Sequence, residues 1–303
     1  QTNGYILNNG TLDGAAVAVI MADPGITTTI NSVISGIGTT LDIDYAGSTL
    51  NLTGANTFTG DVHVNAGTVG LGHDAALGVG GDITLGNNTT LVATTAGINL
   101  THNIILAGNA TLDSGATGAP NGLNVYGAIS GVGDLTKAGA SKLLLTQDST
   151  YVGDTYINAG TVLVSTNAAF STGQLFIADT AGVSTNGANV ALDNNISLAL
   201  GNGFFAAVGS DVFTLNGDID GTGGFNAGGS GTVVLTSLAN SFSGDVFIDT
   251  GTLSVGSDAN LGDVNNTVTV SNGGRLLFTG SFTSARDVDL GTGRLGQVDE
   301  GTD

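Results

Sequence analysis

Cysteine is absent from this chain of 303 residues, which excludes disulfide bonds, thiolate metal sites and thiol nucleophiles. Lysine and arginine together number 5 against 25 acidic residues, giving a net charge of −20 that repels nucleic acids and anionic membrane surfaces. No stretch approaches the roughly 20 apolar residues that a membrane-spanning helix needs. We therefore expect no nucleic-acid partner and no membrane insertion of this segment.

Residues that favour helices are also scarce, since Glu300 is the only glutamate. Glycine is abundant at 51 residues, and asparagine, aspartate, serine and threonine favour turns. Valine, isoleucine, leucine and phenylalanine supply strands, and an apolar fraction of 41% is enough for a continuous core. The composition predicts an all-β protein with short strands and many turns.

The chain repeats one block three times at an interval of roughly 90 residues. The copies read ANTFTGDVHVNAGTVGLG from Ala55, DSTYVGDTYINAGTVLVS from Asp148 and ANSFSGDVFIDTGTLSVG from Ala239. A glycine-rich block precedes each copy, as VISGIG, AISGVG and DIDGTG. The repeat-like blocks therefore span about 33–72, 128–165 and 218–256.

Apolar residues alternate within each block, as they do in half-buried strands. We predict that the matched aliphatic residues Val64, Ile157 and Ile248 face inward. The matched aromatics are further structural repeat positions, namely Phe58, Tyr151 and Phe242. Gly67, Gly160 and Gly251 lie in the predicted turns, where glycine can adopt positive φ. The other matched glycines of the repeat are Gly60, Gly153 and Gly244.

A β-sandwich or β-barrel has similar short strands. Three features favour a right-handed parallel β-helix (β-solenoid) that forms an elongated rod: repetition, few charges, and turn residues at matching positions, as stacked ladders would require. We expect residues 1–303 to form a single solenoid segment of a longer repeat array, because the repeats are incomplete at both ends and the chain starts at Gln1.

These blocks resemble the passenger-associated transport repeat of bacterial autotransporters. The second unit matches best, through Gly133–Gly139 with Lys137 inside it and Tyr151–Val164, whereas the third has Ala227 in place of the lysine. The resemblance implies a β-solenoid passenger at the cell surface or outside the cell, attached to a Gram-negative outer membrane through a C-terminal translocator β-barrel. It also implies that folding of the repeats aids export.

Few residues suggest catalysis or metal binding. The three histidines, His63, His73 and His102, match no metal-ligand spacing, and we expect each to be an isolated surface residue. Three carboxylate pairs are spaced to share one strand face, the last with Arg286 beside it: Asp42 and Asp44, Asp218 and Asp220, Asp287 and Asp289. Exposed turn aspartates explain them better than the acid pair of a carbohydrate-active enzyme. No serine-hydrolase motif occurs.

The sequence thus predicts a structural or adhesive surface segment with no catalytic, cofactor-binding or metal-binding residues. A structural calcium ion stays open, because aspartates and turn carbonyls are suitable ligands although no calcium motif is present. Expected partners are molecules of host or neighbouring cells, or further copies of the chain. The alternatives are a self-assembling matrix, filament or surface-layer component and, less favoured, a carbohydrate-active enzyme. Candidate surface insertions are Ala116–Asn121 and the aromatic pair in Asn202–Phe205.

Overall fold

The computed structural model describes residues 5–7, 11–13, 17–21, 23–115 and 122–297. Within these ranges the regular structure is β-strand, apart from the short 3-10 helix η1 (Asp258–Leu261). The chain divides into two compact units, residues 1–155 and 156–303. No helix among the described residues is long and apolar enough to span a membrane.

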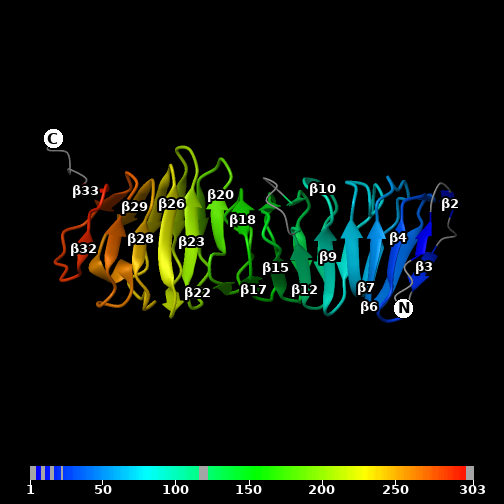
Figure 1. The fold of residues 1–303 in the computed structure, drawn as a ribbon, viewed down its shortest axis with the longest axis horizontal. Helices are drawn as coiled ribbons and strands as arrows, with labels where there is room; N and C mark the ends of the chain where they lie inside the picture. The colour runs from blue at the N-terminus through cyan, green and yellow to red at the C-terminus, as the bar shows by residue number, and fades with distance from the viewer. Residues whose placement is uncertain (1–4, 8–10, 14–16, 22, 116–121, 298–303) are drawn as a thin grey trace. The chain divides into compact units, whose positions relative to one another are not determined.

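In the first unit, parallel strands that lie one coil apart in the sequence pair into columns (Figure 1). The first column contains β3 (Val17–Met21), the start of β6 (Thr40–Leu52), the start of β7 (Val62–Leu71), β8 (Ile83–Leu85), β11 (Ile104–Leu106) and β14 (Ile129–Gly131). The second contains β1 (Tyr5–Leu7), β4 (Thr27–Ile30), the ends of β6 and β7, β9 (Thr89–Ala93), β12 (Ala110–Asp113) and β15 (Leu135–Ala138). The remaining strands pair as β2 (Thr11–Asp13) with β5 (Val33–Ser35), and as β10 (Ile98–Leu100), β13 (Leu123–Val125) and β16 (Leu143–Leu145).

The second unit has the same construction, and β17 (Thr155–Ile157) runs across the boundary. One column contains β19 (Leu175–Ile177), β22 (Ile196–Leu198) and β25 (Ile219–Gly221). Another contains β18 (Thr161–Val164), β20 (Gly182–Thr185), β23 (Asn202–Ala207), β26 (Gly224–Gly229), β28 (Val246–Ile248), β30 (Val268–Val270) and β32 (Val288–Asp289). The third contains β21 (Val190–Leu192), β24 (Val212–Leu215), β27 (Thr232–Leu235), β29 (Thr252–Val255), β31 (Arg275–Phe278) and β33 (Arg294–Gln297).

This pairing confirms the predicted all-β parallel β-solenoid. Every paired strand is parallel to its partner in the next coil, as when Ile83 pairs with Ile104 and Ile104 with Ile129. A sandwich or barrel of antiparallel hairpins would pair neighbouring strands instead. Right-handedness follows the general preference of parallel crossover connections and stays a prediction.

Alternation of side chains places the aliphatic residues inside each coil. Val64, Ile157 and Ile248 are completely buried, and their neighbours His63 and Phe247 are half-buried on the outside. Burying each such aliphatic side chain contributes about 1.5–3 kcal/mol. Each coil therefore depends on its neighbours to exclude water from its interior.

Aromatic rings continue this interior in the second unit. The ring of Phe205 stacks on Phe225 with centroids 4.8 Å apart, and Phe225 lies 6.0 Å from Phe242. The expectation of a surface insertion at Asn202–Phe205 is therefore wrong, because these residues form strand β23 and Phe205 is completely buried. The other expected insertion, Ala116–Asn121, lies outside the described residues.

Buried asparagines connect successive coils at the corners. Asn56 accepts a hydrogen bond from the Ile34 backbone and donates one to the Ala76 carbonyl. Asn240, at the matching place in the third repeat, does the same between Ile219 and Asn260. Each amide thus satisfies backbone groups that the turn would otherwise leave without partners.

The long sequence repeat is not a whole number of coils. In the first unit, Leu41–Ile43 lies in the first column, paired with Val62–Val64. The equivalent residues of the second repeat, Leu135–Lys137, lie in the second column, paired with Ala110–Leu112. One sequence repeat therefore covers several whole coils plus one additional face of a coil, so that equivalent residues of successive repeats lie in different columns. The expectation that matched turn residues stack into ladders is wrong within this unit.

In the second unit, too, equivalent residues of successive repeats lie in different columns. The carbonyl of Ile157 accepts a hydrogen bond from Ala178, just after β19, whereas the equivalent Ile248 belongs to the column of β26 and β28. Equivalent residues therefore meet different neighbours in successive repeats, and the columns are built from residues that are unrelated in the sequence repeat.

Candidate binding surface

The predicted repeat positions lie inside the coils and not on a binding surface. Their six apolar and aromatic members are completely buried: Phe58, Val64, Tyr151, Ile157, Phe242 and Ile248. Tyr151 places its hydroxyl against that of Thr155, and burial raises the pKa of this tyrosine. These residues fill the interior of the coils and are not accessible to a partner at the surface.

The matched glycines serve backbone geometry. One set, Gly67, Gly160 and Gly251, has φ of 88°, 67° and 64°, the left-handed region that favours glycine. The other set consists of Gly60, Gly153 and Gly244, where an added Cβ would come within 2.2–2.4 Å of backbone atoms in the preceding coil. Both sets allow neighbouring coils to approach closely, which is a structural role.

Two of the three histidines are at the surface, as expected. His63 is half-buried, and its Nδ1 lies 2.8 Å from Oδ1 of Asp42, its partner across the strands. His73 is exposed and accepts a hydrogen bond from the Ala75 backbone. Neither histidine lies in a cluster of three ligating side chains among the described residues.

The surface expectation is wrong for His102, whose residue is only 6% exposed. Neither ring nitrogen has a hydrogen-bond partner, and burial lowers the pKa of the ring although Asp82 acts to raise it. His102 lies in the bend between β10 and β11, and the alternation of buried and exposed residues from Leu100 to Ile104 continues through this bend and turns its ring inward. The same parity in the sequence was the signal that could have identified it.

The predicted carboxylate pairs do not assemble into a catalytic group. Asp44, Asp218, Asp220, Asp287 and Asp289 are exposed, and Asp42 faces His63. The described residues contain no group of three acidic or histidine side chains that could hold a metal ion. The carboxylates therefore lie as separate surface groups along the coils.

Arg286 is turned away from the aspartates beside it in the sequence. Its guanidinium is buried and donates hydrogen bonds to Oδ1 of Asp258 at 2.9 Å and to the Gly262 carbonyl at 2.7 Å. Burial acts to raise the pKa of Asp258, but hydrogen bonds from Ser284 and Arg286 outweigh it and lower that pKa. The arginine fastens the irregular segment after β31 onto η1.

Lys137 is a buried cation that sequence reasoning did not place in the interior. It alternates with Leu135 on β15, is completely buried, and pairs across the strands with Leu112. Its Nζ donates to the carbonyls of Ala138 at 2.8 Å and Gly139 at 2.7 Å. Burial lowers its pKa from 10.5 to about 8, although Asp113 acts to raise it.

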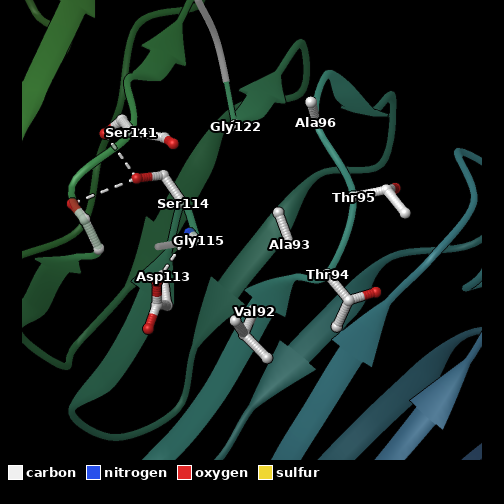
Figure 2. Close-up of a pocket in the computed structure, with 11 residues that line it drawn as sticks. Val92, Ala93, Thr94, Thr95, Ala96, Asp113, Ser114, Gly115, Gly122 and Ser141 are labelled. Carbon is white, nitrogen blue, oxygen red and sulfur yellow. Dashed lines mark hydrogen bonds between the residues drawn. The ribbon is translucent and has the colours of Figure 1, made fainter. Parts of the chain in front are cut away.

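A pocket of about 400 Å³ opens where β9 and β12 end (Figure 2). Gly139, whose carbonyl accepts a hydrogen bond from Lys137, is one of the residues that line it. The Ser114 hydroxyl donates a hydrogen bond to the Ser141 carbonyl at 2.6 Å, and the Asp113 carboxylate accepts one from the Gly115 backbone at 2.8 Å. Thr94 donates to the Leu71 carbonyl. The polar side chains of Thr94, Asp113 and Ser114 are thus engaged with the chain's own backbone.

The second column presents an outward row of threonines that the sequence did not reveal. Successive strands bring their hydroxyl groups into register: Thr27, Thr49, Thr68, Thr90, Thr111 and Thr136. Thr27 is exposed and the other five are half-buried. Paired strands lie about 4.8 Å apart, so the row is a regular array of hydroxyl and methyl groups.

Parallel coils and buried repeat residues define a parallel β-solenoid. Three segments match the family model of the passenger-associated-transport-repeat, at residues 47–71, 135–164 and 225–255. The chain thus carries the repeats of an autotransporter passenger.

A curated relative supports the same relationship. The adhesin BmaC autotransporter of Brucella suis biovar 1 (strain 1330) is 37% identical over 166 residues, and this chain is distantly homologous to it. The match covers 54% of this chain but only 4% of the adhesin, so the chain corresponds to a small part of that protein. No solved structure matches the chain.

Proposed function

We propose that this chain is a surface-displayed structural and adhesive segment of an autotransporter passenger, and that its folding aids export. The observation that supports this most directly is the separation of roles within the coils. The apolar repeat residues fill the interior, while the outward positions that alternate with them on the strands, such as His63 and Phe247, are left partly open to solvent. The similarity to an adhesin autotransporter supports an adhesive role outside the cell.

Folding can contribute to export because each coil completes the interior of its neighbour. Coils that fold as they emerge from a translocator would bury apolar residues and oppose return of the chain. The absence of cysteine suits this passage, since no disulfide can form before the chain has crossed. The partners would be molecules of host or neighbouring cells at the outer surface of a Gram-negative bacterium.

The export part can be tested with two substitutions on one strand of the full-length protein. Ile248→Asp puts an unpaired carboxylate into the interior, at a cost of several kcal/mol. Phe247→Asp adds the same charge at the half-buried outward position beside it. We expect surface labelling of intact cells to fall strongly for the first and little for the second. Equal display of both, with the first shown to be unfolded, would refute the folding role.

The adhesive part needs a separate measurement. Cells that display the wild-type protein should attach to host-cell or neighbouring-cell layers better than cells displaying a passenger from which residues 1–303 have been removed. Surface labelling must be equal in the two strains for the comparison. Equal attachment at equal display would contradict an adhesive role for this segment.

A further inference from the structure

We propose that the threonine row of the second column is a binding track for a neutral polysaccharide that lies along the solenoid coils. The proposal rests on the proposed surface-displayed, adhesive function and specifies its ligand class and its face. The track consists of the six threonines named above, all in the first unit, on β4, β6, β7, β9, β12 and β15, which lie side by side in Figure 1.

The track is rigid because the residues beside each threonine are fixed in the interior. Leu50, Val69, Leu91 and Leu112 follow the track threonines on β6, β7, β9 and β12 and are completely buried. Threonine itself has few side-chain conformations because it is β-branched. A ligand that binds such a row therefore meets hydroxyl groups that are already ordered, with little loss of side-chain freedom.

The hydroxyl groups of the track are available to a ligand. None of the six makes a side-chain hydrogen bond to another described residue, whereas Thr94 at the end of the same face donates to the Leu71 carbonyl. A threonine hydroxyl can donate one hydrogen bond and accept two. Sugar hydroxyls have the same capacity, so each can pair with the track without leaving an unsatisfied group.

Two hollows flank the track on opposite edges of the face. At the start of the strands, Thr49 and Thr68 line a pocket of about 430 Å³ together with Asn87 and Asn88. At their ends, Val92 and Asp113 line the pocket of about 400 Å³ shown in Figure 2. Substituents of a chain lying on the track would have room at both edges.

Charge favours a neutral ligand. The chain carries a net charge of −20, and the outward residues of the track's strands include the Asp113 carboxylate, while Lys137 on β15 is buried and turned inward. An anionic polymer would be repelled, and a cation finds no ligating cluster among the described residues. Because the hydroxyl groups recur at about 4.8 Å, a polymer of repeating sugars can engage several at once and gain affinity from each.

The test uses the purified 303-residue chain and immobilised hexamers of β-1,4-linked glucose and of N-acetylglucosamine, with polygalacturonate as the anionic comparison. We expect binding to at least one neutral hexamer and none to polygalacturonate. The triple variant Thr68→Val, Thr90→Val and Thr111→Val keeps shape and strand propensity but removes three hydroxyls. The triple variant should bind at least about tenfold more weakly, since each lost hydrogen bond contributes modestly to affinity and three are lost together.

Two control triples separate hydroxyl loss from general effects. Thr84→Val, Thr214→Val and Thr269→Val remove half-buried outward hydroxyls from other columns and should leave binding unchanged. Thr68→Ser, Thr90→Ser and Thr111→Ser keep the hydroxyls and should retain most of the binding. Circular dichroism and thermal unfolding of each variant show whether its fold is intact.

The outcomes separate this inference from the proposed function. Equal binding by the valine triple and wild type, or equal binding to polygalacturonate, would overturn the threonine track. Absence of binding to both neutral hexamers would also overturn it, while attachment of cells displaying the wild-type protein would leave the adhesive function standing. If the displayed protein also fails to support attachment, both fail.

Discussion

Removing a hydrogen-bonded side chain usually lowers the stability of a protein, but removing the buried ammonium of Lys137 should raise it. We expect Lys137→Met to stabilise the protein at pH 7. Methionine has a similar length and can fill the same interior space beside Leu112. The carbonyl of Ala138 keeps the hydrogen bond that it accepts from the Ser114 backbone. The Gly139 carbonyl loses its Lys137 donor, but Gly139 is half-buried and lines the pocket.

The magnitude follows from the pKa. The pKa of Lys137 falls from 10.5 to about 8 in the folded protein. At about 1.4 kcal/mol per pH unit, this shift corresponds to a penalty of roughly 3 kcal/mol for holding the charged form in the folded state. Above pH 10.5 both states hold a neutral lysine and the penalty is absent. The penalty grows as pH falls from 10.5 toward about 8, because Lys137 takes up its proton in the unfolded chain before it does so in the folded protein. Below about pH 8 the lysine is charged in both states and the penalty has its full size.

Urea unfolding at pH values from 7 to 9.5 tests this reasoning. Wild type should gain stability through the upper part of this range, whereas Lys137→Met should lack that gain and be about 1–3 kcal/mol more stable at pH 7. Lys142→Met, at an exposed position nearby, serves as the control and should follow wild type. A Lys137→Met protein that is less stable at pH 7 and keeps the wild-type pH dependence would refute the buried-charge interpretation.

Two further predictions concern buried polar side chains. Because burial lowers the pKa of His102, the contribution of the neutral ring to stability is complete above about pH 6.5 and is lost at lower pH. In unfolding experiments, His102→Gln should reduce this loss of stability in acid, whereas His73→Gln, at an exposed position, should not. Asn240→Ala should lower the unfolding free energy by about 2–4 kcal/mol, since it orphans the Ile219 amide and the Asn260 carbonyl. Exposed Asn265→Ala, as its control, should change it by less than about 0.5 kcal/mol.

Local features of the fold could be predicted because they depend on neighbours in the sequence. Alternation identified Val64, Ile157 and Ile248 as inward residues, and all three are completely buried. Glycine at 67, 160 and 251 marked turns, and each has positive φ. Repetition together with few charges separated a parallel solenoid from a sandwich.

Two sequence interpretations failed for residues whose surroundings come from other coils. His102 and Phe205 were expected at the surface, but alternation places both inside, where the next coils cover them. An imidazole or a phenyl ring is compatible with either environment, so residue type alone did not decide between them.

The sequence by itself determined that the chain alternates, turns and repeats, because strand parity and positive φ are properties of a few adjacent residues. The tertiary structure alone decided which residues stack. Track threonines such as Thr49, Thr68 and Thr90 are separated by unequal numbers of residues, and coils of different length bring them into one row. The long repeat and the coil have different periods, so the surface that a partner meets arises from stacking and not from the repeated motif.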